Sequence, residues 1–263
     1  MKAQLGILSL LFAFNAFAEL GVGRGVLTGS DQGNLLKDFN NQNRERILRN
    51  KHQIVLTFDD GPTAGVTDKV LDVLKKHDVK GTFFVIGNNV SAQPGLMKRL
   101  VKEGHLVANH SMSHPNLADL GLFWRKKLKQ EVMGAHEVLT PYLENNKRLY
   151  FRAPMGAWES KLADYLNKDD VGSKYIGPLL WDVGGEMKRD DSKVYKAADW
   201  ACWAQGWSVD DCLEGYVNET IKYDGGVILM HDLRLKSAEL LDKYLEVTKA
   251  RGFQFLTLDE IDL

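Results

Sequence analysis

The chain has 263 residues, of which 44% are hydrophobic and 26% are charged, and its formal net charge is -1 at pH 7. These proportions exclude the disordered and fibrous classes of protein and fit one large globular domain. A charge this close to zero gives no reason to expect a nucleic acid or an anionic membrane surface as a partner.

The N-terminus has the pattern of a secretory signal peptide. Lys2 precedes a short apolar core at residues 5–14, and Ala16-Phe17-Ala18 provides a small-x-small cleavage site. That core is too short to cross a bilayer as a retained helix. The residue directly after the cleavage site is not a cysteine, so no membrane anchor of the lipoprotein type is expected. We predict a protein exported to the periplasm or beyond the cell, with no protein partner evident. Its expected parts are a signal peptide at 1–18, an extension packing on the fold at 19–50 and one domain at 51–263.

Beyond residue 50, short apolar runs alternate with amphipathic stretches. This alternation predicts an α/β fold with a parallel sheet, either open or closed into a barrel. The expected strands cover 54–58, 82–86, 106–109, 149–152, 227–230 and 253–256, with an extended segment at 175–183. The expected helices cover 66–76, 93–102, 122–139, 160–167, 209–222 and 237–249.

Reactive side chains lie at the carboxyl ends of four of these strands. They are Asp59 with Asp60, then His110, Arg152 and His231. In α/β barrels the strand-to-helix loops converge at that face and hold the active site. The four strand ends therefore predict one shared site.

One carboxylate and two imidazoles predict a divalent-metal site. Asp60 follows the first strand, and His110 and His114 follow the third. Three such ligands leave positions open for water and substrate, and the donor set suits zinc, although cobalt, nickel or manganese would also be accepted. The alternative is a histidine pair on a helix surface, but Pro115 favours a loop.

The second carboxylate, Asp59, is free to act as a general base on water activated by the metal. Gly61-Pro62 predicts a tight turn that presents Asp59 and Asp60 in different directions. The alternative role for Asp59 is to cap the following helix, although a capping aspartate does not need an acidic neighbour.

Four segments resemble motifs of a known family. Residues 57–62 (TFDDGP), 104–115 (GHLVANHSMSHP), 152–156 (RAPMG) and 228–232 (ILMHD) resemble the first, second, third and fifth motifs of the polysaccharide deacetylases (NodB homology, carbohydrate esterase family 4). The resemblance implies a distorted (β/α) barrel of the NodB-homology type. It also implies an enzyme that hydrolyses N-acetyl groups of a β-1,4-linked amino-sugar polymer.

The resemblance further implies roles for individual residues. Asp59 would be the base, oriented by Arg152, and His231 would be the acid that protonates the departing amine. The backbone N–H of Met155 would help to bind the oxyanion of the tetrahedral intermediate, and Leu229 would line the pocket for the acetyl methyl group. The implied metal ligands are Asp60, His110 and His114. The expected substrate contacts are Pro154, Met155, Leu229 and Trp200.

The fourth motif departs from the family pattern. The family usually has an Asp-Trp pair after the sixth strand, whose aspartate supports the catalytic histidine. The corresponding region here contains Asp182 without a following tryptophan, and an Asp-Trp pair comes only at Asp199. Either Asp182 or Asp199 would support His231, and the sequence leaves both open.

The segment that follows Asp199 contains Trp200, Trp203 and Trp207. Indole rings beside a barrel mouth could stack on sugar rings; the alternative is that they cap the core. Cys202 and Cys212 would close a short disulfide loop in an exported protein, the alternative being two buried free thiols.

These residues favour a secreted metal-dependent deacetylase with peptidoglycan as its glycan substrate, acting on N-acetylglucosamine or N-acetylmuramic acid. Chitin oligomers or acetylated xylan would be served by the same chemistry. The remaining alternatives are a catalytically inactive glycan-binding protein of the same fold and a hydrolase of a different amide.

Overall fold

The computed structural model describes residues 51–190 and 194–261. The predicted signal peptide (1–18) and N-terminal extension (19–50) lie outside the described residues, so both stay predictions. Among the described helices, none combines the length and the apolar character needed to cross a membrane.

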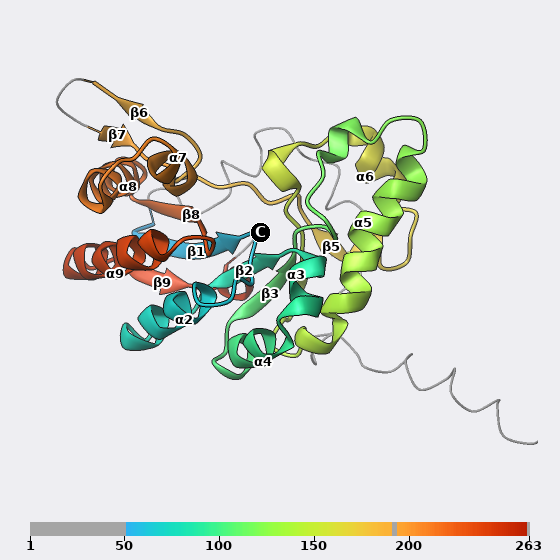
Figure 1. Ribbon diagram of the computed structural model, residues 1–263, viewed down its shortest axis with the longest axis horizontal. Coiled ribbons are helices and arrows are strands. Elements are labelled where there is room, and N and C mark those ends of the chain that lie inside the picture. Colours follow the sequence, from blue (N-terminus) through green and yellow to red (C-terminus); the bar gives the residue numbers. More distant parts are fainter. Residues whose placement is uncertain (1–50, 191–193, 262–263) are drawn as a thin grey trace, which may run out of the picture.

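A parallel sheet of five strands forms the centre of the fold (Figure 1). β1 (Gln53–Asp59) pairs along its whole length with β8 (Gly225–His231). The other edge of β1 pairs with β9 (Gln254–Leu256) near its start and with β2 (Thr82–Val85) near its end. β3 (Leu106–Asn109) extends the sheet beyond β2. All five strands are parallel, so their carboxyl ends meet at one edge.

Two further strands bend this sheet into a distorted barrel. β4 (Leu149–Tyr150) and β5 (Tyr175–Ile176) pair with each other in parallel. A single bridge joins β3 to Phe151, just after β4, and another joins Val183 to β8. The predicted barrel is therefore confirmed, with its closing side made of very short strands rather than of the continuous extended segment expected at 175–183.

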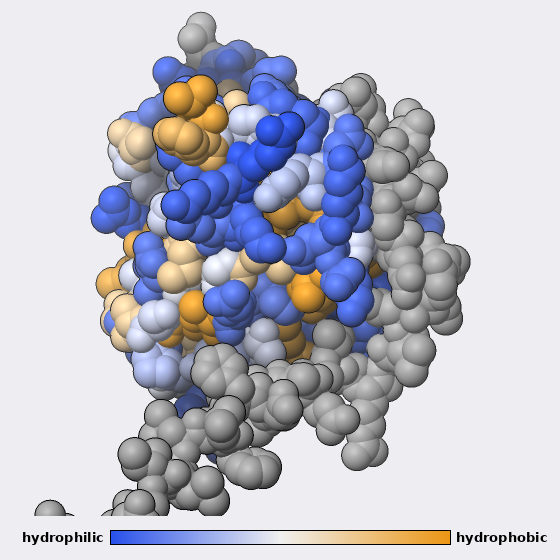
Figure 2. Space-filling view, turned by 90° about the vertical axis from the view of Figure 1, so that its right-hand side faces the viewer, coloured by the Kyte–Doolittle hydropathy of each residue, from blue (hydrophilic) through white to orange (hydrophobic). Residues whose placement is uncertain are grey.

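Helices cover the outside of the barrel, and their described bounds agree within two residues with those predicted. In Figure 1, α2, α4 and α9 lie along one side of the sheet, while α5 and α6 lie at the far end from α8. Figure 2 faces the side of the molecule that holds α5 and α6, and its surface is mostly hydrophilic with small separate hydrophobic patches. The bounds are α2 (Thr67–Lys76), α4 (Pro94–Lys102), α5 (Trp124–Leu139), α6 (Ser160–Leu166), α8 (Val209–Tyr223) and α9 (Leu235–Ala250).

Two short helices and one hairpin were not predicted from the sequence. α3 (Gly87–Ala92) precedes α4, and α7 (Asp199–Ala204) forms in the tryptophan-rich segment. β6 (Lys188–Arg189) and β7 (Val194–Lys196) form an antiparallel pair that projects from the body in Figure 1. Elements of two to six residues are too short to display a hydrophobic period, which explains why the sequence did not indicate them.

Alternating residues of the strands divide the core into two layers, because successive side chains of a strand point to opposite faces. In β1, Leu56 and Phe58 belong to the large cluster that packs against the helices, which includes Leu71 of α2. Val55 belongs to a smaller cluster inside the barrel, together with Phe84 of β2. The inner layer sets the position of the site described next.

Candidate active site

The predicted reactive residues continue the inward-facing series of three strands. Each series begins in the inner hydrophobic cluster and ends on a polar side chain at the carboxyl end of its strand. Two-residue periodicity therefore directs all three polar side chains toward the same end of the barrel. The series are Val55–Thr57–Asp59, Leu106–Ala108–His110 and Val227–Leu229–His231.

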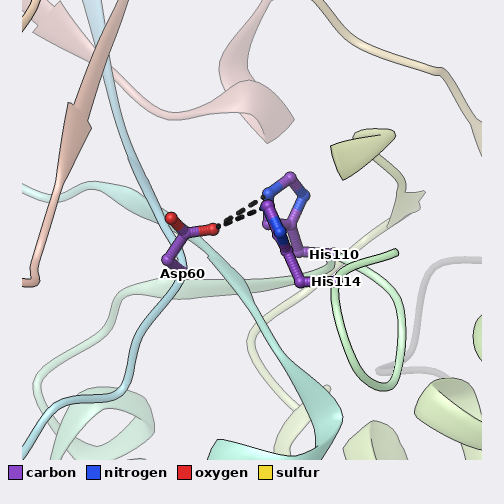
Figure 3. A group of neighbouring side chains, drawn as sticks. All are labelled: Asp60, His110 and His114. Carbon is purple, nitrogen blue, oxygen red and sulfur yellow. Dashed lines mark ion pairs between the residues drawn. The ribbon is translucent and has the colours of Figure 1, made fainter. Parts of the chain in front are cut away.

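Asp60, His110 and His114 come together as the sequence predicts (Figure 3). Asp60 Oδ1 lies 3.1 Å from His114 Nε2 and 3.3 Å from His110 Nε2. Two ligands of one tetrahedral zinc ion, at bond lengths near 2.0–2.1 Å, stand about 3.4 Å apart. The spacing of the three side chains therefore fits a single shared cation.

Hydrogen bonding also prepares these side chains for a cation. His110 Nδ1 donates to the carbonyl oxygen of Arg152 at 2.8 Å, which fixes the ring so that Nε2 is the nitrogen facing Asp60. Asp60 Oδ1 is buried and has no hydrogen-bond partner among the described residues. A buried carboxylate oxygen that faces two ring nitrogens would be stabilised by a positive ion between them.

The two loops that carry Asp60 and the histidines have demanding backbone conformations. Asp60, Ser111 and His114 all have left-handed backbones, with φ of 75°, 68° and 61°. Glu131 of α5 accepts hydrogen bonds from the backbone N–H groups of Met112 and Ser113. Such backbone strain persists only where surrounding contacts fix it, and it is common at functional sites.

Asp59 forms a buried ion pair with Arg152. Its guanidinium nitrogen Nη1 lies 2.6 Å from Asp59 Oδ1 and also donates to Thr57 Oγ1 at 2.9 Å. Arg152 is completely buried, and its Nε donates to the carbonyl oxygen of Leu179. Asp59 Oδ2 is left on the side of the metal ligands, 3.6 Å from His110 Nε2.

Asp199 is the carboxylate that holds His231. Its Oδ1 lies 2.7 Å from His231 Nδ1, and its Oδ2 accepts from the backbone N–H of His231 at 2.8 Å. Ser237 donates to the same Oδ2, and the Tyr216 hydroxyl accepts from the backbone N–H of Asp199. Asp199 has no exposed surface, so this contact is shielded from water.

Asp182, the alternative partner that the sequence left open, lies elsewhere. Its Oδ2 accepts from the backbone N–H of Val227 at 3.0 Å, four residues before His231 on β8. At about 3.3 Å per residue, that contact is about 13 Å along the strand from the catalytic end. The carboxylate that contacts His231 is therefore Asp199, whereas Asp182 accepts a hydrogen bond from the β8 backbone.

The charges of the site shift two pKa values that matter for catalysis. Burial alone would raise the pKa of Asp60, but His110 and His114 hold it well below its usual range. Burial likewise opposes the charged form of His231, yet Asp199, Asp59 and Asp60 together raise its pKa to about 9. His231 therefore carries a proton at neutral pH.

A pocket of about 390 Å³, here called the reaction pocket, opens among these residues. It contains the predicted Asp59, the three metal ligands, Met155, Leu229, His231 and Trp200. Pro154 and Arg152 are buried, and neither is among its lining residues. The sequence reasoning missed four lining residues: Ala153, Trp181, Gly185 and Leu233. Their only signal was proximity to a motif.

The tryptophans of the α7 region do not share one role. Trp200 is 54% exposed and lines the reaction pocket. Trp203 is partly buried and donates to Ser237 Oγ at 3.0 Å, while Trp207 lies under the guanidinium of Arg189. The hypothesis of a sugar-stacking surface is therefore retained for Trp200, whereas Trp203 and Trp207 pack against the core.

Cys202 and Cys212 form a disulfide, as predicted. It joins α7 to α8, so it covalently links the helix that carries Asp199 to the body of the protein. Both cysteines are fully buried.

A residue that the sequence reasoning overlooked lies behind the first motif. Asp232 is fully buried, accepts a hydrogen bond from Thr67, and burial raises its pKa to about 7. A Cβ at Gly61 would come within 2.1 Å of Asp232 Oδ2, so only glycine fits there. Asp232 thus supports the turn from which Asp60 projects.

Comparison with known proteins gives a consistent result. A protein-family model described as "Polysaccharide deacetylase" matches residues 47–172. The chain is 33% identical over 213 residues to the peptidoglycan-N-acetylmuramic acid deacetylase PdaA of Bacillus subtilis, covering 79% of this chain and 70% of that protein. It is 36% identical over 214 residues to the peptidoglycan-N-acetylglucosamine deacetylase PgdA of Listeria monocytogenes, covering 80% of this chain but only 38% of that protein.

A solved structure shows the same similarity in three dimensions. The crystal structure of the Bc1960 peptidoglycan N-acetylglucosamine deacetylase superposes with a TM-score of 0.65 at 29% sequence identity. The match covers 82% of this chain and 90% of that one. The similarity therefore extends over the whole barrel rather than over single motifs.

Proposed function

We propose that this chain, which belongs to the polysaccharide deacetylase family, is a metal-dependent hydrolase that removes N-acetyl groups from the amino sugars of peptidoglycan. The observation that carries the proposal is the reaction pocket, where a carboxylate, three metal-ligand side chains and a protonated histidine converge. Relatives named as peptidoglycan deacetylases support the choice of polymer.

Asp60, His110 and His114 would hold the divalent cation, and their oxygen and nitrogen atoms suit zinc. When bound there, such a cation polarises a carbonyl oxygen and lowers the pKa of water. Two hydrogen bonds described above keep these ligands oriented. One runs from His110 to the Arg152 carbonyl oxygen, and the other from the loop that carries the histidines to Glu131.

Asp59 takes a proton from the attacking water. Arg152 occupies Oδ1 of Asp59, so the proton is taken by Oδ2, which faces the metal ligands. The water oxygen bonds to the acetyl carbonyl carbon, giving a tetrahedral oxyanion. The backbone N–H of Met155, which lines the pocket in a left-handed conformation, assists in binding that oxygen.

His231 donates the proton that the departing nitrogen requires. Asp199 holds Nδ1, so Nε2 is the nitrogen that delivers the proton into the pocket. Asp59 and His231 are register partners on adjacent strands, which puts base and acid on either side of one acetyl group. Cleavage of the C–N bond then yields acetate and a free amine, with Leu229 beside the methyl group.

We also propose that the protein is exported, as its signal-peptide pattern suggests. An exported enzyme meets peptidoglycan directly, because this polymer lies outside the cytoplasmic membrane.

Acetate release from purified peptidoglycan tests the proposed function. The protein from residue 19 onward is incubated with and without a chelator, and mass spectrometry of the digested sugars identifies the one that lost its acetyl group. We expect chelator-sensitive acetate that zinc restores. Release from chitin oligomers or xylan alone would keep the mechanism and change the polymer. No acetate from any of these, with metal bound, would favour an inactive glycan-binding protein.

A second histidine–carboxylate cluster supplies a matched control. His77 follows the C-terminal end of α2, and Asp242 and Glu246 lie on α9, so the cluster offers the same donor types as the reaction pocket. Lys76 already lies 2.7 Å from Asp242. His77→Gln is therefore expected to keep acetate release and its chelator sensitivity. Loss of either in that variant would mean that the functional cation lies outside the reaction pocket.

A further inference from the structure

A second pocket adjoins the reaction pocket and has no role in the mechanism above. It measures about 700 Å³ and is here called the side pocket. Its walls are α7, Val66 and residues 233–237 at the start of α9. Trp200, Leu233 and His231 line both pockets, so a chain of sugar rings can pass from one into the other.

The rim of the two pockets is unusually apolar for a protein surface. Of the eight large hydrophobic side chains exposed among the described residues, four line these pockets. Large exposed apolar surface of this kind marks binding sites, and apolar and aromatic side chains pack on the faces of sugar rings. The four residues are Met155, Trp200, Leu233 and Leu235.

Two positive charges line the side pocket and have no ionic partner among the residues that the structure describes. Arg234 and Lys236 are exposed, and no carboxylate of the described residues forms an ion pair with either. Lys236 Nζ lies 5.5 Å from the ring centre of Trp203. The only acidic residue that lines the pocket among those described is Asp199, which is fully buried and bonded to His231. The side pocket therefore offers net positive charge to a ligand.

The reaction pocket offers no basic side chain of this kind. Asp59 and Asp60 line it, and its described lining contains no lysine or arginine. A carboxylate on the sugar being deacetylated would therefore find no lysine or arginine to pair with among the described lining residues. A carboxylate on the neighbouring sugar would instead reach the side pocket.

We propose that the side pocket binds the carboxylate-bearing sugar next to the one that is deacetylated, through Arg234 and Lys236. This inference rests on the proposed function. Peptidoglycan alternates N-acetylglucosamine with muramic acid, whose lactyl group carries a carboxyl that is either free or joined to a stem peptide with carboxyls of its own. N-acetylglucosamine is then the sugar that loses its acetyl group, and its muramic acid neighbour fills the side pocket.

The test compares three substrates that differ in where they carry carboxylates. Chitopentaose has none, glycan strands stripped by an amidase have free lactyl carboxylates, and intact strands carry theirs on the stem peptides. For Arg234→Ala/Lys236→Ala, the preference in kcat/KM for carboxylate-bearing strands over chitopentaose is expected to fall about tenfold, mainly through KM, because charge-assisted hydrogen bonds are lost. A fall on stripped strands identifies the lactyl carboxylate, and a fall confined to intact strands identifies the stem peptide.

Lys98→Ala/Lys102→Ala is the matched control. It also removes two exposed lysine charges, but from α4, which contributes no residue to either pocket. This variant should keep the full preference. An equal fall in both variants, or no fall in Arg234→Ala/Lys236→Ala, would overturn the proposal, as would acetyl loss from muramic acid in stripped strands.

Two further measurements keep the inference separate from the proposed function. If the wild-type protein releases no acetate, the proposed function fails. Tryptophan fluorescence titration with stripped strands and chitopentaose still compares the affinities of wild type and variant. Equal affinities would then overturn the side-pocket proposal as well. If Arg234→Ala/Lys236→Ala unfolds, Arg234→Gln/Lys236→Gln removes the charges while keeping side-chain length.

Discussion

The two sides of the reaction pocket are built in different ways. On one side, Asp59, Asp60 and His110 project from the ends of the central strands and are held by buried neighbours of the same sheet. On the other side, His231 depends on Asp199, which comes from a six-residue helix 32 positions earlier in the chain. That helix is kept in place by a disulfide and by Tyr216 and Ser237.

This difference suggests that metal binding and proton delivery can be separated by mutation. The first side is fixed by the strand ladder itself. On the second side His231 ends a ladder strand, but the helix that carries Asp199 is attached to the barrel through a few side-chain contacts and a disulfide. Changes on the α7 side should therefore leave the cation in place, and changes among the metal ligands should remove both functions.

The largest effect is expected from Asp60→Ala or His110→Ala. Either change removes a ligand from the three-ligand site, so both bound zinc and turnover are lost, by more than the ~10⁴-fold upper range for loss of a general base. Elemental analysis of the purified variants and acetate release measure the two losses. Full activity in a variant without metal would contradict the mechanism.

Asp59→Asn should sharpen the comparison, because it disables chemistry while leaving the ligands intact. We expect zinc content close to that of the wild type and kcat lower by about 10²–10⁴-fold. Isothermal titration with zinc, paired with acetate release, separates the two. If zinc affinity fell as far as kcat, Asp59 would have to be a ligand as well.

Asp199→Asn addresses the opposite side. Loss of the carboxylate lowers the pKa of His231 from about 9 toward its ordinary value, so the alkaline limb of the kcat/KM profile moves to lower pH. We expect kcat lower by about 10²-fold, the lower end of the range for a general acid, with zinc retained. Asp182→Asn is the matched control: it should lower stability through the Val227 contact and leave the alkaline limb in place. A shift in the Asp182 variant instead would reverse the two assignments.

Cys202→Ser/Cys212→Ser tests the covalent attachment of α7. Closing a loop of this length stabilises the folded state by about 3 kcal/mol in the loop-entropy description. We expect the free energy of unfolding to fall by about that amount, with a smaller loss of kcat and unchanged zinc affinity. Urea unfolding and zinc titration measure both; an equally large loss of zinc affinity would show that the two sides are coupled.

The smallest effect is expected at His105, which directly precedes β3 and does not line the reaction pocket. Its Nδ1 accepts from the backbone N–H of Gly81, and burial lowers its pKa to about 3. Between pH 6.5 and 3 this histidine therefore binds a proton in the unfolded chain but not in the folded chain. The free energy of unfolding falls as the pH falls through that window, by up to about 1.4 kcal/mol per pH unit. His105→Gln should remove this slope, which urea unfolding at pH 6 and pH 5 would detect.

Most of the barrel was predictable because its signals are local. The strands that carry Asp59, His110 and His231 are apolar runs next to amphipathic helices, and their two-residue alternation determines which side chains face inward. The metal ligands follow from the same strand ends, with His114 in the loop that Pro115 indicated. The sequence could not reveal α3, α7 and the β6–β7 hairpin, because each is shorter than the periods that pattern reading requires.

The chain by itself determined the reactive side chains and the face of the barrel on which they lie, since alternation along a strand is a property of the backbone. Only the tertiary structure decided between Asp182 and Asp199 as the partner of His231. It also made Pro154 a buried residue that does not line the reaction pocket, and it placed Trp200, Arg234 and Lys236 around one pocket. These outcomes depend on how segments far apart in the chain dock against one another. Hydrogen-bond partners and pocket walls are set by that docking, which no spacing within one segment encodes.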